Sequence, residues 1–200
     1  MSIEELKKNA LKNGIEVIFV QTGQEALEKA KEYIKPGLSI GLGGSVSVEE
    51  IGLLEYLTSR KDITLYNQYE DGISKEENTK RRKNGITADI YITGTNAITK
   101  EGWLINYDGS GNRVAAQIFG SDKLLIIAGV NKIVSDIHEG LDRIEKIAAV
   151  KNAQRLNKKA LTFGKSADAT AQSISNKGGI IHKDVPGRIS VILVNETLGY

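Results

Sequence analysis

Residues 15–47 read IEVIFVQTGQEALEKAKEYIKPGLSIGLGGSVS and place a helix pattern between two strand patterns. Residues 15–20 form a β-branched run typical of a strand, and residues 38–40 are expected to form a second strand. Between them, residues 22–25 have the spacing of a helix capping box, and the Pro-Gly pair at 36–37 ends the predicted helix. This alternation favours a parallel sheet covered by helices.

The remaining chain continues the same alternation. Residues 124–128 are the most hydrophobic run and are expected to form a central strand. Residues 157–188 lack periodicity, so we expect a long irregular excursion from a single α/β domain that spans residues 1–200. Further strands are expected at 63–66, 88–92, 96–99, 103–106 and 189–194, and further helices at 3–11, 48–59, 74–84 and 135–156.

Composition narrows the classes of function. The chain has 200 residues, of which 40% are hydrophobic, so it can bury a substantial core. Its 27 basic and 25 acidic residues give a net charge of +2, which predicts no nucleic-acid partner. No apolar run reaches the ~18 residues that span a bilayer, and no secretory pattern is present, so we expect a cytoplasmic protein with no membrane contact. The absence of cysteine excludes disulfides, thiolate-bound zinc and an iron–sulfur cluster of the usual kind.

Four loops are expected at the carboxyl ends of strands, where open α/β sheets bind ligands. They cover residues 43–47, 93–96, 106–113 and 129–132, and their hydroxyls, amides and cations suit a small polar anion. The candidate ligand-binding residues are Gly43, Gly44, Ser45, Ser47, Thr93, Gly94, Thr95, Asn96, Asn106, Gly109, Gly111, Asn112, Arg113 and Asn131.

Four of the charged residues have candidate chemical roles. Arg113 could hold a carboxylate with two parallel hydrogen bonds, and Lys132 could act as a point charge. Asp108 is the best candidate for a general base, with Glu101 as the second choice. Three of them have a structural alternative: Asp108-Gly109 is a common turn dipeptide, Arg113 could pair with an acidic neighbour, and Lys132 could be solvated.

The glycine-rich loop leaves two interpretations open. Ser47 begins a second capping box and is expected to be the N-cap of a helix. Ser45 has no such role, and anion binding there is weighed equally with a tight turn that needs glycine for packing. The loop lacks the third glycine of a dinucleotide fingerprint and the lysine of a Walker loop. Neither His138 nor His182 has a neighbour at metal-ligand spacing, so no metal site is expected.

Several motifs resemble those of the lactate utilisation (LUD) domain family. They lie in residues 43–54, 88–99, 106–116 and 128–133, in the family's order. The resemblance implies a Rossmann-like three-layer α/β/α fold with a mostly parallel sheet, similar to ribose-5-phosphate isomerase and the coenzyme A transferases. It also implies a role in lactate utilisation with a small anionic metabolite as ligand, and it is compatible with a redox partner protein or a homo-oligomer.

The segment before the last strand departs from the family pattern. Single-domain relatives carry cysteines there in the form Lys-Cys-x-x-Cys, and some family members belong to an iron–sulfur complex that oxidises L-lactate. Here residues 165–170 read KSADAT, either because this lineage lost a site or by design. We therefore expect no cofactor in this chain.

Three hypotheses for function follow. The first is a LUD-type protein that binds a small hydroxy acid at the four loops. The second is a sugar-phosphate isomerase that uses Asp108 or Glu101 as its base. The third is a non-enzymatic subunit whose residues 157–188 dock a redox partner. Whether the chain is an enzyme stays open at this point.

Overall fold

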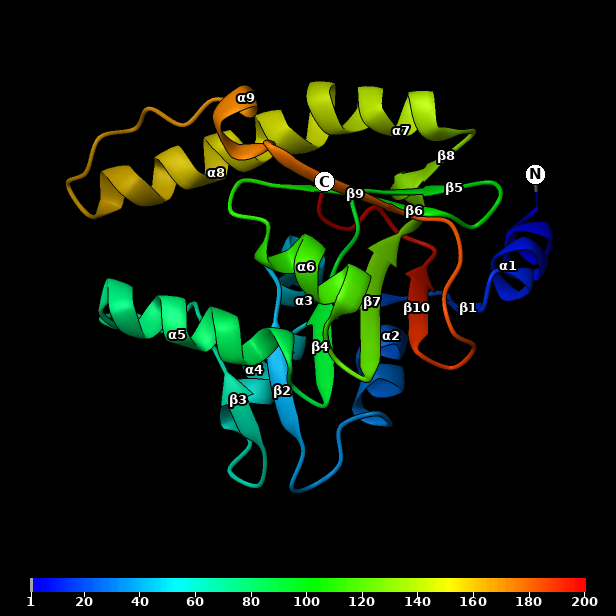
Figure 1. The fold of residues 1–200 in the computed structure, drawn as a ribbon, viewed down its shortest axis with the longest axis horizontal. Coiled ribbons are helices and arrows are strands. Elements are labelled where there is room, and N and C mark those ends of the chain that lie inside the picture. Colours follow the sequence, from blue (N-terminus) through cyan, green and yellow to red (C-terminus); the bar gives the residue numbers. More distant parts are fainter. Residues whose placement is uncertain (1) are drawn as a thin grey trace.

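The computed structural model describes residues 2–200, whose strands form a six-stranded and a four-stranded sheet (Figure 1). All neighbouring strands of the larger sheet are parallel, which confirms the predicted α/β class. Its order is β1 (Ile15–Val20), β10 (Ile189–Val194), β7 (Lys123–Gly129), β4 (Ile90–Thr93), β2 (Ser39–Leu42) and β3 (Thr64–Tyr66).

Strand β7 is central, as its sequence predicts. Leu124 and Ile126 pack into the core on one face of the sheet, while Leu125 and Ile127 pack into the core on the other. A strand that is buried on both faces needs apolar side chains at every position, so it reads as a continuous hydrophobic run.

Helices cover both faces of this sheet. One face is covered by three helices whose apolar residues join the larger core cluster, while the other is covered by two helices and the smaller sheet. The first group is α2 (Gly23–Lys31), α3 (Val46–Glu50) and α4 (Leu53–Ser59), and the second is α1 (Ile3–Lys12) and α6 (Asn112–Phe119). Helix α5 (Lys75–Ile86) packs beside β2 and α6.

The single helix expected at residues 48–59 is two helices, and its expected N-cap is wrong. The helix is interrupted at Gly52, whose φ of +75° lies in the left-handed region that favours glycine. The N-cap of α3 is Ser45, whose hydroxyl accepts a hydrogen bond from the Val48 amide. Ser47 lies inside α3 and is fully buried.

The strands expected at 96–99 and 103–106 are present in the smaller sheet, where β5 (Ala97–Thr99) and β6 (Leu104–Asp108) form an antiparallel hairpin. Strand β8 (Ile133–Val134) pairs with β5, and β9 (Lys177–Ile181) pairs with β6. The prediction that residues 157–188 are irregular is therefore wrong for β9. The Gly178-Gly179 pair of β9 lacks the β-branched side chains that indicate a strand. Glycine is needed at position 178 because the ring of Tyr107 on β6 occupies the space that a side chain there would fill.

A long helical segment crosses the molecule beyond the smaller sheet (Figure 1). It consists of α7 (Ile137–Arg143), a π-helical turn (Ile144–Ala148) and α8 (Ala149–Thr162), followed by the short helix α9 (Ala171–Ile174). It extends past the expected end at residue 156. No helix formed by residues 2–200 is long and apolar enough to cross a lipid bilayer.

We expect Leu125→Ala to lower the free energy of unfolding by about 2–5 kcal/mol, because Leu125 is fully buried at the centre of the sheet. Urea denaturation measures this change. The matched control is Leu161→Ala, whose side chain on α8 is 65% exposed and whose loss should change stability by less than about 0.5 kcal/mol. Equal effects of the two substitutions would contradict the placement of β7.

Candidate functional site

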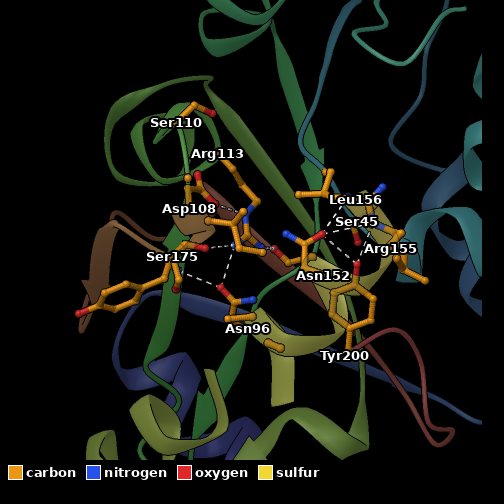
Figure 2. A pocket seen from close by; sticks show the side chains of 18 of the residues that line it. Ser45, Asn96, Asp108, Ser110, Arg113, Asn152, Arg155, Leu156, Ser175 and Tyr200 are labelled. Atoms are coloured by element: carbon orange, nitrogen blue, oxygen red, sulfur yellow. Dashed lines mark hydrogen bonds and ion pairs between the residues drawn. The ribbon is translucent and has the colours of Figure 1, made fainter. Parts of the chain in front are cut away.

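A pocket of about 370 Å³ lies where loops from the carboxyl ends of β2, β4 and β6 meet helices α5, α6 and α8 (Figure 2). The segment that follows β10 closes one side with Tyr200. All four predicted loops contribute residues to its lining. The predicted residues that line the pocket are Gly44, Ser45, Gly94, Thr95, Asn96, Asp108, Gly109, Asn112, Arg113 and Lys132.

The other predicted ligand-binding residues do not line the pocket and support its walls instead. Gly43 leaves room for the side chain of Thr93, and Asn131 accepts a hydrogen bond from the Leu198 amide. Asn106 accepts one from the Asn96 amide. The residues in this supporting group are Gly43, Ser47, Thr93, Asn106, Gly111 and Asn131.

Glu101 was wrongly expected near the site. It is exposed at the tip of the β5–β6 hairpin, and its carbonyl accepts a hydrogen bond from the Asn13 amide side chain at 2.8 Å. The hairpin places this tip against α1, whereas the other end of β6 reaches the pocket. Glu101 therefore cannot act as a base there.

Sequence reasoning missed the residues that the helices contribute. On α5, Asn78 and Arg82 are four residues apart and face the pocket together, although the basic run at 80–83 reads as a solvated surface. On α8, Asn152, Arg155 and Lys159 form one stripe at helical spacing. This spacing was a usable signal, but only the fold shows which helix face meets the loops.

Arg113 and Asp108 form the best-connected pair in the pocket wall (Figure 2). Arg113 Nε donates to Asp108 Oδ1 at 2.8 Å, and Arg113 Nη2 donates to Asn96 Oδ1 at 2.8 Å and to the Tyr107 carbonyl at 2.9 Å. The second oxygen of Asp108 accepts from the Val114 amide at 2.8 Å. Both carboxylate oxygens are thus engaged within the protein, which favours the structural alternative for Asp108 over a free general base.

Two further guanidinium groups, those of Arg82 and Arg155, line the pocket. Arg82 Nη2 donates to Ser110 and Asn112, and its buried Nε has no partner within residues 2–200. Arg155 Nε donates to Tyr200 Oη at 2.9 Å and to Asn152 Oδ1 at 3.2 Å. In the described part of the chain, neither guanidinium forms an ion pair with a carboxylate.

Lys132 is buried at the base of the site, with only 3% of its surface exposed. It ends a 3-10 turn (Val130–Lys132) after β7, and its Nζ donates to the buried Ser47 hydroxyl at 2.9 Å. Burial, followed by the positive charges of Arg143 and Arg113, lowers the pKa of Lys132 to about 7. The amine is thus partly neutral near pH 7, whereas the sequence suggests that it acts as a point charge.

The residues of the segment 165–170 do not fit an iron–sulfur cluster. They contain no thiol, and most of their side chains are exposed on the loop between α8 and α9. Within residues 2–200, no group of three or more His, Cys, Asp or Glu side chains is placed to hold a metal ion.

We expect Asp108→Ala to destabilise the fold by about 3–5 kcal/mol, because it leaves the nearly buried Arg113 guanidinium without its counter-charge. Urea denaturation tests this expectation. Asp142→Ala is the matched control, since its ion pair with Lys146 is more than half exposed and should contribute less than about 1 kcal/mol. A loss below about 1 kcal/mol for Asp108→Ala would contradict the structural role of the pair.

Lys132→Met should flatten the pH dependence of stability between pH 7 and about 10. Between the folded pKa of about 7 and the ordinary value of 10.5, the unfolded chain binds the extra proton. The wild type therefore gains stability as pH rises through this window, by up to about 1.4 kcal/mol per pH unit. Urea denaturation at several pH values gives both slopes, and identical slopes would show that the pKa of Lys132 is unshifted.

Similarity to solved structures concerns the fold. A crystal structure of a DUF162 family protein from Deinococcus radiodurans has a TM-score of 0.53 and 17% identity, with 96% of each chain covered. Ribose 5-phosphate isomerase from Plasmodium falciparum has a TM-score of 0.35 and 23% identity, covering 64% of this chain and 66% of that one. The Methanocaldococcus jannaschii ribose 5-phosphate isomerase A has a TM-score of 0.36 and 17% identity, covering 82% and 68%.

Family membership rests on the sequence. No curated protein is significantly similar to the chain. The LUD domain model, in contrast, matches residues 3–194, which include both sheets and nearly all of the residues that line the pocket. The chain belongs to the LUD domain family, which is associated with lactate utilisation.

Proposed function

We propose that the protein binds a small carboxylate of lactate metabolism, a hydroxy acid or the corresponding oxo acid, in the pocket. The supporting observation is the charge of the pocket wall. Five basic residues line it against two acidic ones, and one of the acidic residues, Asp108, is already paired with Arg113. The basic residues are Arg82, Arg113, Lys132, Arg155 and Lys159, and the acidic residues are Glu49 and Asp108.

The chemistry of these cations favours a carboxylate as the ligand. Arg82 and Arg155 keep N–H groups without a protein partner in the described chain, and a guanidinium matches a carboxylate with two parallel hydrogen bonds. The binding of an anion would also offset the mutual repulsion of the two arginines.

The neutral polar groups complete the fit to a hydroxy acid. Ser45, Asn152 and Ser175 line the same pocket and can hydrogen-bond a hydroxyl next to the carboxylate. A volume of about 370 Å³ lies at the small end of the range for small-molecule sites. The isomerase hypothesis receives less support, because Glu101 lies elsewhere and both oxygens of Asp108 are engaged.

L-lactate or pyruvate should raise the melting temperature of the full chain, because a ligand that binds only the folded state stabilises it. At a ligand concentration about 100 times Kd, the gain is about 2.7 kcal/mol. Differential scanning fluorimetry with a panel of hydroxy and oxo acids measures the shift, with acetamide and methyl lactate as uncharged comparisons.

Arg155→Gln should remove most of the shift, while Lys158→Gln should retain it. Both substitutions remove one positive charge from α8, but Lys158 is exposed and does not line the pocket. The melting temperatures without ligand show whether either variant is itself destabilised. The proposal fails if no acid of the panel stabilises the wild type, or if both variants lose the shift equally.

A further inference from the structure

We propose that the Lys132 amine condenses with the carbonyl carbon of a 2-oxo acid in the pocket and holds it as an imine. This inference rests on the proposed function, because it assumes that the pocket accepts small carboxylates. It goes beyond that function by assigning a covalent site to one residue and by separating oxo acids, which carry a carbonyl group, from hydroxy acids, which do not.

The position of Lys132 supports this assignment. Its side chain lines the pocket, although only 3% of the residue's surface is exposed. The amine can therefore contact a bound ligand while it is shielded from bulk water. Its only hydrogen bond within residues 2–200 goes to Ser47 Oγ, and no carboxylate lies within ion-pair distance there. A lysine that serves structure alone normally has a carboxylate partner when it is buried.

The neighbours of Lys132 favour the neutral amine. Arg143 is held beside it by hydrogen bonds from Nε to the Asn131 carbonyl at 3.1 Å and from Nη1 to the Asn96 carbonyl at 2.7 Å. The charges of Arg143 and Arg113 oppose protonation, while Glu50 favours it more weakly. With a pKa of about 7, much of the amine carries a free lone pair at neutral pH, which is the form that attacks carbonyl groups.

The pocket also contains groups that can bind the carboxylate of a 2-oxo acid. A 2-oxo acid carries its carboxylate on the carbon next to the carbonyl. The unpaired donors of Arg155 and the edge of Arg113 line the same pocket as Lys132 and can bind that carboxylate. Binding of the carboxylate would hold the carbonyl in the same small volume as the amine.

The step balances without any further reactant. The Nζ lone pair forms a bond to the carbonyl carbon, and the carbonyl oxygen takes up a proton from the amine to give a carbinolamine. Loss of that oxygen as water, with a second proton, leaves a C=N bond between the lysine and the acid. Addition of water reverses the sequence and releases the oxo acid unchanged.

Reductive trapping tests the inference. The full chain is incubated with pyruvate and then sodium cyanoborohydride, and intact mass and peptide mapping follow. We expect one carboxyethyl group per chain, located on Lys132. Lactate under the same conditions should give none, because it has no carbonyl. Lys132→Met should lose the adduct, whereas Lys158→Met, which removes an exposed lysine of α8 that does not line the pocket, should keep it.

The outcomes separate this inference from the proposed function. Heat stabilisation by pyruvate without an adduct on Lys132 would overturn the imine and leave carboxylate binding intact. Labelling spread equally over Lys158, Lys159 and Lys132 would also overturn it, because exposed lysines react without a site. The absence of both stabilisation and labelling would overturn both proposals. Because mapping uses the wild-type chain, a poorly folded Lys132→Met variant does not affect these conclusions.

Discussion

The pocket depends on one nearly buried guanidinium. Arg113 lies in the first turn of α6. Its guanidinium donates hydrogen bonds to the side chains of Asp108 and Asn96 and to the carbonyl groups of Tyr107 and Gly94. These groups come from the loop after β4 and from the end of β6, which belong to different sheets. One side chain therefore fixes how the smaller sheet sits over the carboxyl ends of the larger one. An arginine suits this task because its planar fork directs several donors at once.

The pairing of the Asp108 carboxylate with Arg113 affects the electrostatics of the other cations in the pocket. Asp108 pairs with Arg113, and within residues 2–200 no carboxylate forms an ion pair with Arg82 or Arg155. Repulsion among partly desolvated cations costs free energy, which binding of an anion recovers. The same field acts on Lys132, where burial and the nearby guanidinium groups favour the neutral amine. Ligand binding and the reactivity of that amine thus share one physical origin.

The position of the smaller sheet explains why an enclosed pocket forms at the edge of an open parallel sheet. Loops at the carboxyl ends of parallel strands normally face solvent. Here β5, β6 and β9 cover part of this edge, and α8 lies beyond them (Figure 1). The space between the loops and α8 becomes a pocket rather than an open crevice. Tyr200 contributes the last contact, because its hydroxyl joins Arg155 and Asn152 of α8.

The sequence alone determined the α/β class, the central strand β7, the β5–β6 hairpin and most of the loop residues that line the pocket. Each depends on local patterns: apolar runs, turn residues and the rule that sites lie at strand carboxyl ends. Only the tertiary structure decided that Glu101 lies away from the site, that Arg82 and Arg155 enter it, and that Gly178-Gly179 belongs to a strand. The same holds for Asp108, whose role depends on Arg113, and for Lys132, whose pKa depends on burial. These properties arise from contacts between segments far apart in the chain, and no local pattern encodes them.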